Sequence, residues 1–325
     1  NLLALHCENF RPRFFAVSSI EQATVLSKTT LARPIMILGD RRWEEILFCV
    51  EEGYSFFVHR LDFVEKLSRL GEKKQEKISF QINIDTGMSR YGVSWRDAND
   101  FLSGVRIHSS LHIEGLMTHL AQSDELDKSF AGIQLERFQG VVQNAKHNKW
   151  IDNDCLVHGS NTGGYLDLPH AHFDAVRLGI LPLGVYPSET CRRIEGIKPV
   201  MSLTSTLAST RNIEMGDHVG YGMHFTAKKK MKIGTIPLGY GQGYPRLRNQ
   251  GFVLIRGKRA PIIGGNSMDA SMVDLSRCGD CQTGDEVILL GSTAHDQISC
   301  RDLASWSNTV PYEIMLKLGK MHELQ

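Results

Sequence analysis

Short apolar runs alternate with longer amphipathic segments along the first half of the chain. The short runs predict β-strands, and the longer segments, whose apolar residues recur every three or four positions, predict α-helices. The predicted strands comprise residues 14–18, 35–38, 55–58, 78–84, 111–119, 154–158 and 174–177. Helices are predicted between them, with Ser19 as the cap of the first and residues 129–147 as the longest. Strands that alternate with helices indicate parallel βαβ units.

The number of strands distinguishes two architectures. The seven predicted strands are one fewer than the eight that close a parallel barrel. The chain also opens with a helix-like segment, Asn1 to Leu5, which would follow a further strand. We therefore predict an α/β fold, a (β/α)8 barrel of the TIM type whose first strand precedes Asn1. An open, doubly wound sheet of seven strands is the alternative.

After about residue 195 the pattern changes to short strands and turns. Extended segments are predicted at residues 202–209, 218–221, 232–238, 251–256, 260–264, 272–275 and 286–290, and short helices near 301–306 and 312–318. Glycine and aspartate separate these segments, as is typical of turns. We therefore predict a barrel domain at residues 1–194 and a mostly-β C-terminal domain at residues 195–325.

Composition excludes several classes of partner. The 37 lysines and arginines nearly balance the 36 aspartates and glutamates, which argues against nucleic acid or an anionic membrane surface. No apolar run approaches the roughly 18–20 residues of a membrane helix. The seven cysteines, an odd number, indicate free thiols in a reducing compartment, so we expect a cytoplasmic protein. Cys278 and Cys281 form an isolated C-x-x-C, for which a turn is favoured over a zinc or redox site, and no metal is expected.

Candidate chemistry begins where the predicted strand 78–84 ends. Asp85, Gly87, Arg90 and Gly92 follow it closely. The glycines allow the backbone to turn and to approach a ligand, and the guanidinium can hold a carboxylate through two parallel hydrogen bonds. The segment therefore predicts contact with a small anionic substrate.

Three further strand ends carry polar motifs. His119, residues 158–164 and residues 177–180 all follow predicted strands. Active sites of parallel barrels gather at these carboxyl ends. Asn161, Thr162 and the glycines after them suit a phosphate cradle, because a hydroxyl and free backbone N–H groups would lie at a helix start.

The second half adds motifs that complete a family pattern. They are Val-Gly-Tyr-Gly at 219–222, Ile-Pro-Leu-Gly-Tyr-Gly-Gln-Gly-Tyr-Pro at 236–245, Ser-Met-Asp at 267–269 and Pro-Tyr-Glu at 311–313. In this order, from Phe14 to about Leu318, the motifs resemble the alanine racemase family, which depends on pyridoxal 5'-phosphate (PLP). The resemblance implies a PLP barrel joined to a β domain, in a head-to-tail homodimer whose active sites use both subunits. It also implies interconversion of L- and D-alanine by two bases, which supplies D-alanine for the peptidoglycan of the cell wall.

The resemblance implies a set of cofactor-binding residues. Arg177 would face the pyridine nitrogen, and its permanent charge would keep that nitrogen unprotonated. His119 would lie beside the ring and Arg177, and Asn161 would accompany the same arginine. The implied phosphate ligands are Thr162, the backbone of Gly179 and Ile180, and Tyr312.

The resemblance also implies substrate-side roles. Tyr221, from the partner subunit, would be the catalytic base on one face of the substrate. Arg90 would support this tyrosine and the cofactor's ring oxygen. The backbone N–H of Met268 would meet the substrate carboxylate, with Asp269 beside it in the motif. Tyr240 would line the substrate entrance and, with Tyr312, narrow the pocket toward small side chains.

Two features depart from the family pattern. Asn83 stands where many members carry a carbamylated lysine that braces the arginine, so Arg90 must be held in another way, such as by a bound anion. The family's Schiff-base lysine lies on the first strand, and nothing in this sequence matches it. We expect an upstream segment that carries this lysine. A lysine-less paralogue with a binding role is the alternative from another class.

Three other enzymes compete with this interpretation. A PLP decarboxylase of the same architecture pairs a carboxylate with the pyridine nitrogen, and Arg177 argues against it. A racemase of broad specificity needs a wider entrance than Tyr240 and Tyr312 indicate. A dinucleotide-binding enzyme is prompted by Gly239, Gly241 and Gly243, whose G-x-G-x-G spacing differs from the dinucleotide pattern.

Overall fold

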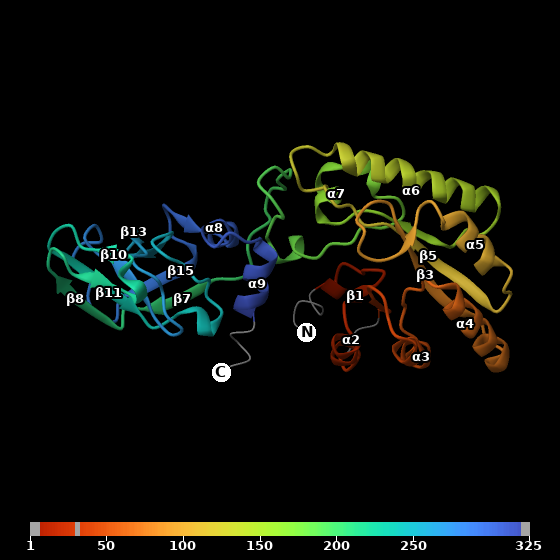
Figure 1. Cartoon of the computed structure of the whole chain (residues 1–325), viewed down its shortest axis with the longest axis horizontal. Helices are drawn as coiled ribbons and strands as arrows, with labels where there is room; N and C mark the ends of the chain where they lie inside the picture. The colour runs from red at the N-terminus through yellow and green to blue at the C-terminus, as the bar shows by residue number, and fades with distance from the viewer. Residues whose placement is uncertain (1–6, 30–32, 320–325) are drawn as a thin grey trace. The chain divides into compact units, whose positions relative to one another are not determined.

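The computed structural model describes residues 7–29 and 33–319 (Figure 1). The chain divides into two compact units, of which the first comprises residues 1–178 and 190–192 and the second residues 179–189 and 193–325. The domain limits at residues 194 and 195 stay a prediction, because compact units need not coincide with folding domains. The helix expected at residues 1–5 lies outside the described residues.

The first unit is built on parallel strands. They are β1 (Phe15–Val17), β2 (Ile35–Ile37), β3 (Ile78–Asp85), β4 (Val93–Ser94), β5 (Leu111–Met117) and β6 (Leu156–His158). β1 pairs with β2, and β5 pairs with both β3 and β6, all in parallel. Single parallel bridges join Ser55 to Met36, Phe57 to Gln81 and Val176 to Ser160.

Apart from the two-residue β4, which pairs with the end of β3, these pairings place successive segments beside one another in chain order. A doubly wound sheet reverses its strand order at a switch point, whereas a barrel does not. The fold is therefore of the (β/α)8-barrel type, as predicted. The strands predicted at 55–58 and 174–177 are only single bridges. At the second, the Asp174 carboxylate accepts the Val157 N–H at 2.9 Å, a bond that a regular ladder would use.

Helices separate the strands of the first unit. They are α2 (Ile20–Ser27), α3 (Trp43–Glu52), α4 (Leu61–Lys74), α5 (Ala98–Arg106), α6 (Ser129–His147) and α7 (Thr162–Asp167), with a 3-10 turn at Pro169–Ala171. Ser19 caps α2 as predicted, since its Oγ accepts from Gln22 N at 3.2 Å. Apolar faces such as Ala98, Phe101 and Leu102 of α5 join the strands in one core. Within residues 7–29 and 33–319, no helix has the length and apolar character to cross a bilayer.

The second unit consists mainly of antiparallel sheets. Its strands are β7 (Leu203–Thr206), β8 (Ser209–Ile213), β9 (His218–Val219), β10 (Phe225–Thr226), β11 (Met231–Ile236), β12 (Phe252–Ile255), β13 (Lys258–Pro261), β14 (Ser271–Asp274), β15 (Glu286–Ser292) and β16 (Gln297–Ile298). The segment predicted as one strand at 202–209 is two strands, because β7 pairs with β15 whereas β8 pairs with β11. Short 3-10 turns cover Leu181–Leu183, Tyr221–Met223 and Tyr240–Gln242.

Two helices, α8 (Cys300–Trp306) and α9 (Pro311–Gly319), complete the second unit where they were predicted. Leu303 and Ile314 of these helices join Val253 and Leu289 of the sheet in its core. Cys278 and Cys281 lie in the turn between β14 and β15, and Cys281 Sγ donates to Cys278 O at 3.4 Å. Burial raises the pKa of the Cys278 thiol to about 11, which disfavours a reactive thiolate there.

Candidate active site

The carboxyl ends of β3, β5 and β6 meet at one edge of the parallel sheet. Asp85 ends β3, Thr118 and His119 follow β5, and His158 ends β6. Thr118 Oγ1 donates to Ile84 O at 2.9 Å and lies 2.7 Å from Thr86 Oγ1. These hydrogen bonds tie the ends of β3 and β5 together, so the side chains that follow them share a fixed frame.

Arg177 lies at the centre of this edge. Its two Nη atoms donate to Thr118 O at 2.8 Å, His158 Nδ1 at 2.9 Å, His158 O at 3.2 Å, His119 Nδ1 at 3.3 Å and Gly159 O at 3.4 Å. All of these acceptors are neutral, and no described carboxylate forms an ion pair with this guanidinium. No described residue accepts a hydrogen bond from its Nε. Arg177 therefore keeps an uncompensated positive charge and a free donor.

Burial and charge keep the two histidines neutral. Burial, followed by the charges of Arg177 and Arg90, lowers the pKa of His119 to about 3. Burial and Arg177 hold the pKa of His158 well below its ordinary value. Burial and the charge of Arg90 lower the pKa of Arg177 to about 10, which leaves it charged at neutral pH. Both imidazoles can therefore accept hydrogen bonds from the guanidinium.

The low histidine pKa values predict acid sensitivity. The pKa of His119 is about 3 in the folded protein, against 6.5 for an ordinary histidine, so acid protonates the unfolded chain first. The resulting stability is present above pH 6.5 and is lost as the pH falls. We expect the free energy of unfolding to drop by about 2 kcal/mol for His119 between about pH 7 and about pH 5, and to drop further because burial also lowers the pKa of His158. Urea unfolding followed by circular dichroism measures this drop.

Matched variants isolate this effect. His119→Gln removes one of the two titrating groups, so the drop should shrink by about 2 kcal/mol. His147→Gln, at an exposed position in the last turn of α6, should leave the drop unchanged. An undiminished drop in His119→Gln would contradict the assignment.

Residues 85–92 form a tight turn beside this edge. Asp85 Oδ1 accepts from Gly87 N at 2.9 Å and from Ser89 N at 3.0 Å. Gly92 has φ +114°, and a Cβ there would lie 2.5 Å from Asn83 O. Asn83 Nδ2 donates to Tyr91 O at 2.5 Å, so Asn83 holds the backbone of the turn.

Arg90 itself is exposed, and its guanidinium lies 5.8 Å from the centre of the Tyr91 ring. Among the described residues it forms no hydrogen bond with Asn83, whose Oδ1 is buried without a partner. The positive charge of Arg90 contributes to the lowered pKa values of His119 and Arg177.

The segment after β6 has free backbone donors. Asn161 caps α7, and its Oδ1 accepts from Gly164 N at 3.0 Å and from Ser123 Oγ at 2.7 Å. The N–H groups of Thr162 and Gly163 have no acceptor among the described residues. A Cβ on Gly163 would lie 2.7 Å from Ser123 Oγ, so the turn requires glycine there. Asn161 makes no hydrogen bond to Arg177 in the described part of the chain; its Nδ2 donates to Leu120 O at 3.2 Å.

Three loops of the second unit bring other predicted residues together. Tyr240 N donates to Ser267 O at 3.1 Å, and Gly241 N donates to Met268 O at 2.7 Å. Gly220, which precedes Tyr221, has φ +75°, and a Cβ there would lie 2.9 Å from Gly265 O. Ser267 Oγ donates to Asp269 Oδ1 at 2.9 Å. The side chains are exposed, at 79% for Tyr221, 62% for Met268 and 40% for Tyr240.

The predicted phosphate ligands divide between the units. Thr162 belongs to the first unit, and Gly179 and Ile180 begin the second. Ile180 is buried in the core of the second unit, whereas the Cα of Gly179 faces open space. Tyr312 lies in the first turn of α9.

Three residues that connect to Arg177 through successive hydrogen bonds were not predicted as site residues from the sequence. The sequence predicts a strand-end motif at 158–164 that includes His158, but it predicts no role for Gln81 or Glu114. His158 Nε2 lies 2.8 Å from Gln81 Oε1, and Gln81 Nε2 lies 3.3 Å from Glu114 Oε2. A polar residue within an apolar strand, such as Gln81 in β3, is the signal that could have identified them.

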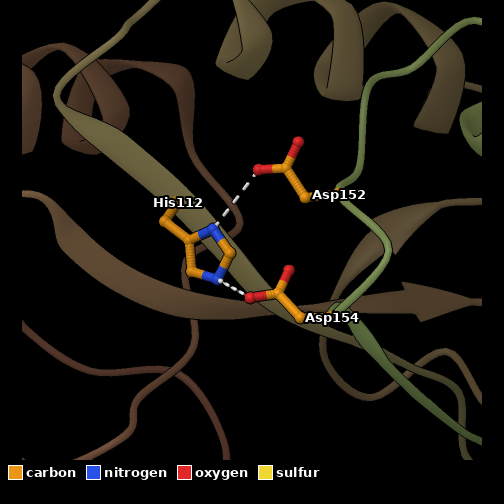
Figure 2. A group of neighbouring side chains, drawn as sticks. All are labelled: His112, Asp152 and Asp154. Carbon is orange, nitrogen blue, oxygen red and sulfur yellow. Dashed lines mark ion pairs between the residues drawn. The ribbon is translucent and has the colours of Figure 1, made fainter.

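A second cluster of titratable groups lies at the other end of β5. Figure 2 shows that the two ring nitrogens of His112 face different carboxylates, with Nδ1 3.6 Å from Asp152 and Nε2 3.6 Å from Asp154. Arg106 also pairs with Asp152 at 3.2 Å. One ligand atom from each of these three residues lies within 4.8 Å of the others, as a metal ion would require, but a metal ion there would meet the positive charge of Arg106. The geometry therefore favours ion pairs.

Comparison with known proteins identifies the family. Residues 4–187 match the family model for the alanine racemase N-terminal domain, and residues 200–324 match that for the C-terminal domain. The chain is 35% identical over 306 residues to alanine racemase of Halothermothrix orenii, covering 94% of this chain and 80% of that protein. It is 32% identical over 323 residues to alanine racemase of Geobacter sulfurreducens, covering 98% and 84%.

Solved structures agree. The crystal structure of alanine racemase from Bartonella henselae with covalently bound pyridoxal phosphate has a TM-score of 0.84 at 29% identity, covering 95% of this chain and 83% of that one. Alanine racemase from Bacillus anthracis with bound L-Ala-P has a TM-score of 0.81 at 29% identity, covering 93% and 78%. The fold and the site thus define a PLP-dependent amino-acid racemase. The chain belongs to the alanine racemase family.

The residues present fit PLP. An unprotonated pyridine nitrogen is an acceptor, and the Nε–H of the charged Arg177, which has no acceptor among the described residues, would be a donor for it. A phosphate needs several donors, and the unpaired N–H groups of Thr162 and Gly163 together with the Thr162 hydroxyl provide them. The first unit therefore offers donors for both polar ends of the cofactor.

Proposed function

We propose that this protein interconverts L-alanine and D-alanine with PLP through two bases, and that the D-alanine supplies peptidoglycan synthesis for the cell wall. The observation that carries the proposal is the uncompensated charge of Arg177, whose acceptors in the described part of the chain are all neutral. A decarboxylase of this architecture would need a carboxylate at the same place, because a protonated pyridine nitrogen strengthens the electron sink.

PLP, when bound, supplies the electron sink for the electron pair that remains when the α-proton leaves. Arg177 would limit that sink, because its guanidinium stays protonated. It would give the pyridine nitrogen a hydrogen bond, whereas a carboxylic acid at the same place would give it a proton. His119 and His158 hold the guanidinium in place as neutral acceptors. Limited delocalisation favours return of the proton to the α-carbon, which is what racemisation requires.

Two bases are needed because racemisation removes a proton from one face of the α-carbon and returns one to the other. We assign one face to the phenol oxygen of Tyr221 from the partner subunit, and the other to a lysine of the segment expected upstream of Asn1. The positive charge of Arg90 would stabilise the phenolate of Tyr221. The high exposure of Tyr221 in this single chain supports its use by a neighbouring subunit.

The remaining predicted residues would bind the cofactor phosphate and the substrate carboxylate, and would limit the size of the substrate. Thr162, the backbone of Gly179 and Ile180, and Tyr312 would hold the phosphate, and Asn161 would keep the start of α7 rigid through its cap. The backbone N–H of Met268, next to Asp269, would meet the substrate carboxylate. Tyr240, with Tyr312, would narrow the entrance, which favours alanine over larger amino acids. We propose a cytoplasmic homodimer.

The cofactor and the reaction can be tested together on the full-length protein. We expect purified protein to carry PLP, which absorbs at visible wavelengths where the polypeptide itself does not absorb. We also expect the protein to convert either enantiomer of alanine to the racemate. Intact mass should report an upstream lysine-bearing segment. Colourless protein that takes up no added PLP would contradict the proposal and favour a lysine-less binding protein. Equal rates with alanine and bulky amino acids would favour a racemase of broad specificity.

A further inference from the structure

A chain of buried hydrogen bonds runs from Arg177 into the barrel. Arg177 Nη1 donates to His158 Nδ1 at 2.9 Å, and His158 Nε2 lies 2.8 Å from Gln81 Oε1. Gln81 Nε2 donates to Ser55 Oγ at 3.2 Å and to Glu114 Oε2 at 3.3 Å. The exposed fraction is 2% for His158, 0% for Gln81 and 5% for Ser55, so water does not compete for these bonds.

Glu114 determines the direction of this chain. Its Oε2 accepts from Ser55 Oγ at 2.5 Å and from Gln81 Nε2. A carboxylate accepts and does not donate, so the NH₂ group of Gln81 must face Glu114. The carbonyl oxygen of Gln81 then faces His158. A flipped amide would place two acceptors, Gln81 Oε1 and the Glu114 carboxylate, against each other.

The orientation of Gln81 sets the tautomer of His158. Gln81 Oε1 can only accept, so His158 Nε2 carries the proton. His158 is neutral because burial lowers its pKa, so Nδ1 has a lone pair. That lone pair is what Arg177 Nη1–H needs, because a guanidinium has no acceptor.

Two backbone features place these groups. The register of β3 and β5 shifts between Phe80 and Gln81, since Phe80 lies opposite Ile113 and Gln81 opposite Gly115. Glu114 is thus an extra residue in β5, and such bulges re-aim a side chain. A Cβ on Gly115 would lie 2.8 Å from Gln81 Oε1, so a glycine there leaves room for the Gln81 amide.

We propose that Glu114 is a positioning residue for Arg177. Through the Gln81 amide it selects the Nε2–H tautomer of His158 and so secures the acceptor that holds the guanidinium. This inference rests on the proposed function for its effect on the rate, but the tautomer itself is independent of any substrate.

Nitrogen NMR of ¹⁵N-histidine-labelled holoenzyme tests the tautomer directly, with a His158→Gln variant to assign the signals. We expect wild-type His158 to carry its proton on Nε2, with Nδ1 unprotonated. In Glu114→Gln the added amide can donate or accept, so a second His158 tautomer should appear. We expect kcat for alanine to fall about tenfold with KM changed less than about twofold.

Two comparisons keep the test specific. Asp62→Asn, an equivalent carboxylate-to-amide change at an exposed ion pair with Arg60, should alter neither the tautomer nor kcat. In a Gln81→Met background, Glu114→Gln should lower kcat by less than about twofold, because Glu114 acts through Gln81.

Wild-type His158 with its proton on Nδ1 would overturn the proposal, as would a Glu114→Gln protein with the wild-type tautomer and rate. If Glu114→Gln does not fold, Gln81→Met, which breaks the link between Glu114 and His158, takes its place, and a wild-type tautomer and rate in that variant would overturn the proposal. A wild-type protein that shows the expected tautomer but no alanine racemisation would instead contradict the proposed function.

Discussion

Replacement of Arg177 by glutamate is expected to lower kcat for alanine racemisation by about 100- to 1,000-fold. The groups around this position are acceptors, including the carbonyls of Thr118 and Gly159. A glutamate at position 177 would lie beside these protein acceptors, which need a hydrogen-bond donor. They would therefore favour the protonated form of its carboxyl group. It can pass that proton to the pyridine nitrogen, which strengthens the electron sink and should increase transamination as a side reaction.

The same variant should change the titration of His119. The charge of Arg177 is the second cause, after burial, of the low pKa of this histidine, so its removal should raise that pKa above about 3. NMR titration of ¹⁵N-labelled histidine measures the shift, and steady-state kinetics with formation of pyruvate measures rate and side reaction. Arg177→Lys keeps the charge with fewer donors and should lose only about tenfold in kcat. Arg60→Glu, at an exposed site, is the matched control. Unchanged kinetics in Arg177→Glu would show that this arginine does not serve the cofactor.

Replacement of Tyr221 by phenylalanine is expected to remove most proton abstraction from one enantiomer only. We assign abstraction from L-alanine to the tyrosine, so deuterium washout from labelled L-alanine should fall by at least about 100-fold. Washout from labelled D-alanine, assigned to the lysine, should persist in part. Net racemisation must slow equally in both directions, because a mutation cannot shift an equilibrium near unity.

The exposure of Tyr221, at 79%, means that loss of its hydroxyl should leave the fold intact. Tyr54→Phe, at a buried tyrosine of the first unit, serves as the control for a lost hydroxyl. Mixing Tyr221→Phe subunits with subunits that lack the lysine should restore part of the activity, because one site of each heterodimer then has both bases. Equal losses of washout for both enantiomers, or no loss for either, would contradict the role of Tyr221.

Local signals in the sequence predicted most of the elements. The Ser19 cap and the helix at 129–147 depend on neighbours within a few residues, and both were predicted correctly. The single strand predicted at 202–209 was wrong, because the choice of partner strand depends on residues 18 to 26 positions away for β8 and 80 to 87 positions away for β7. A single bridge replaced the strand predicted at 174–177 for a similar reason, as the Asp174 carboxylate takes a ladder hydrogen bond.

By itself, the sequence determined the alternation of strands and helices and the polar residues at the strand ends, because these follow from side-chain period and from the direction of parallel strands. The direction of the strands thereby predicted that His119 and Arg177 lie at one edge of the sheet. Only the tertiary structure decided which buried residues form the hydrogen-bonded chain that begins at Arg177. Gln81, Glu114 and His158 come from three strands, and a register shift in β5 sets which of its side chains meets Gln81. Register is a property of paired strands, so no single stretch of sequence contains it.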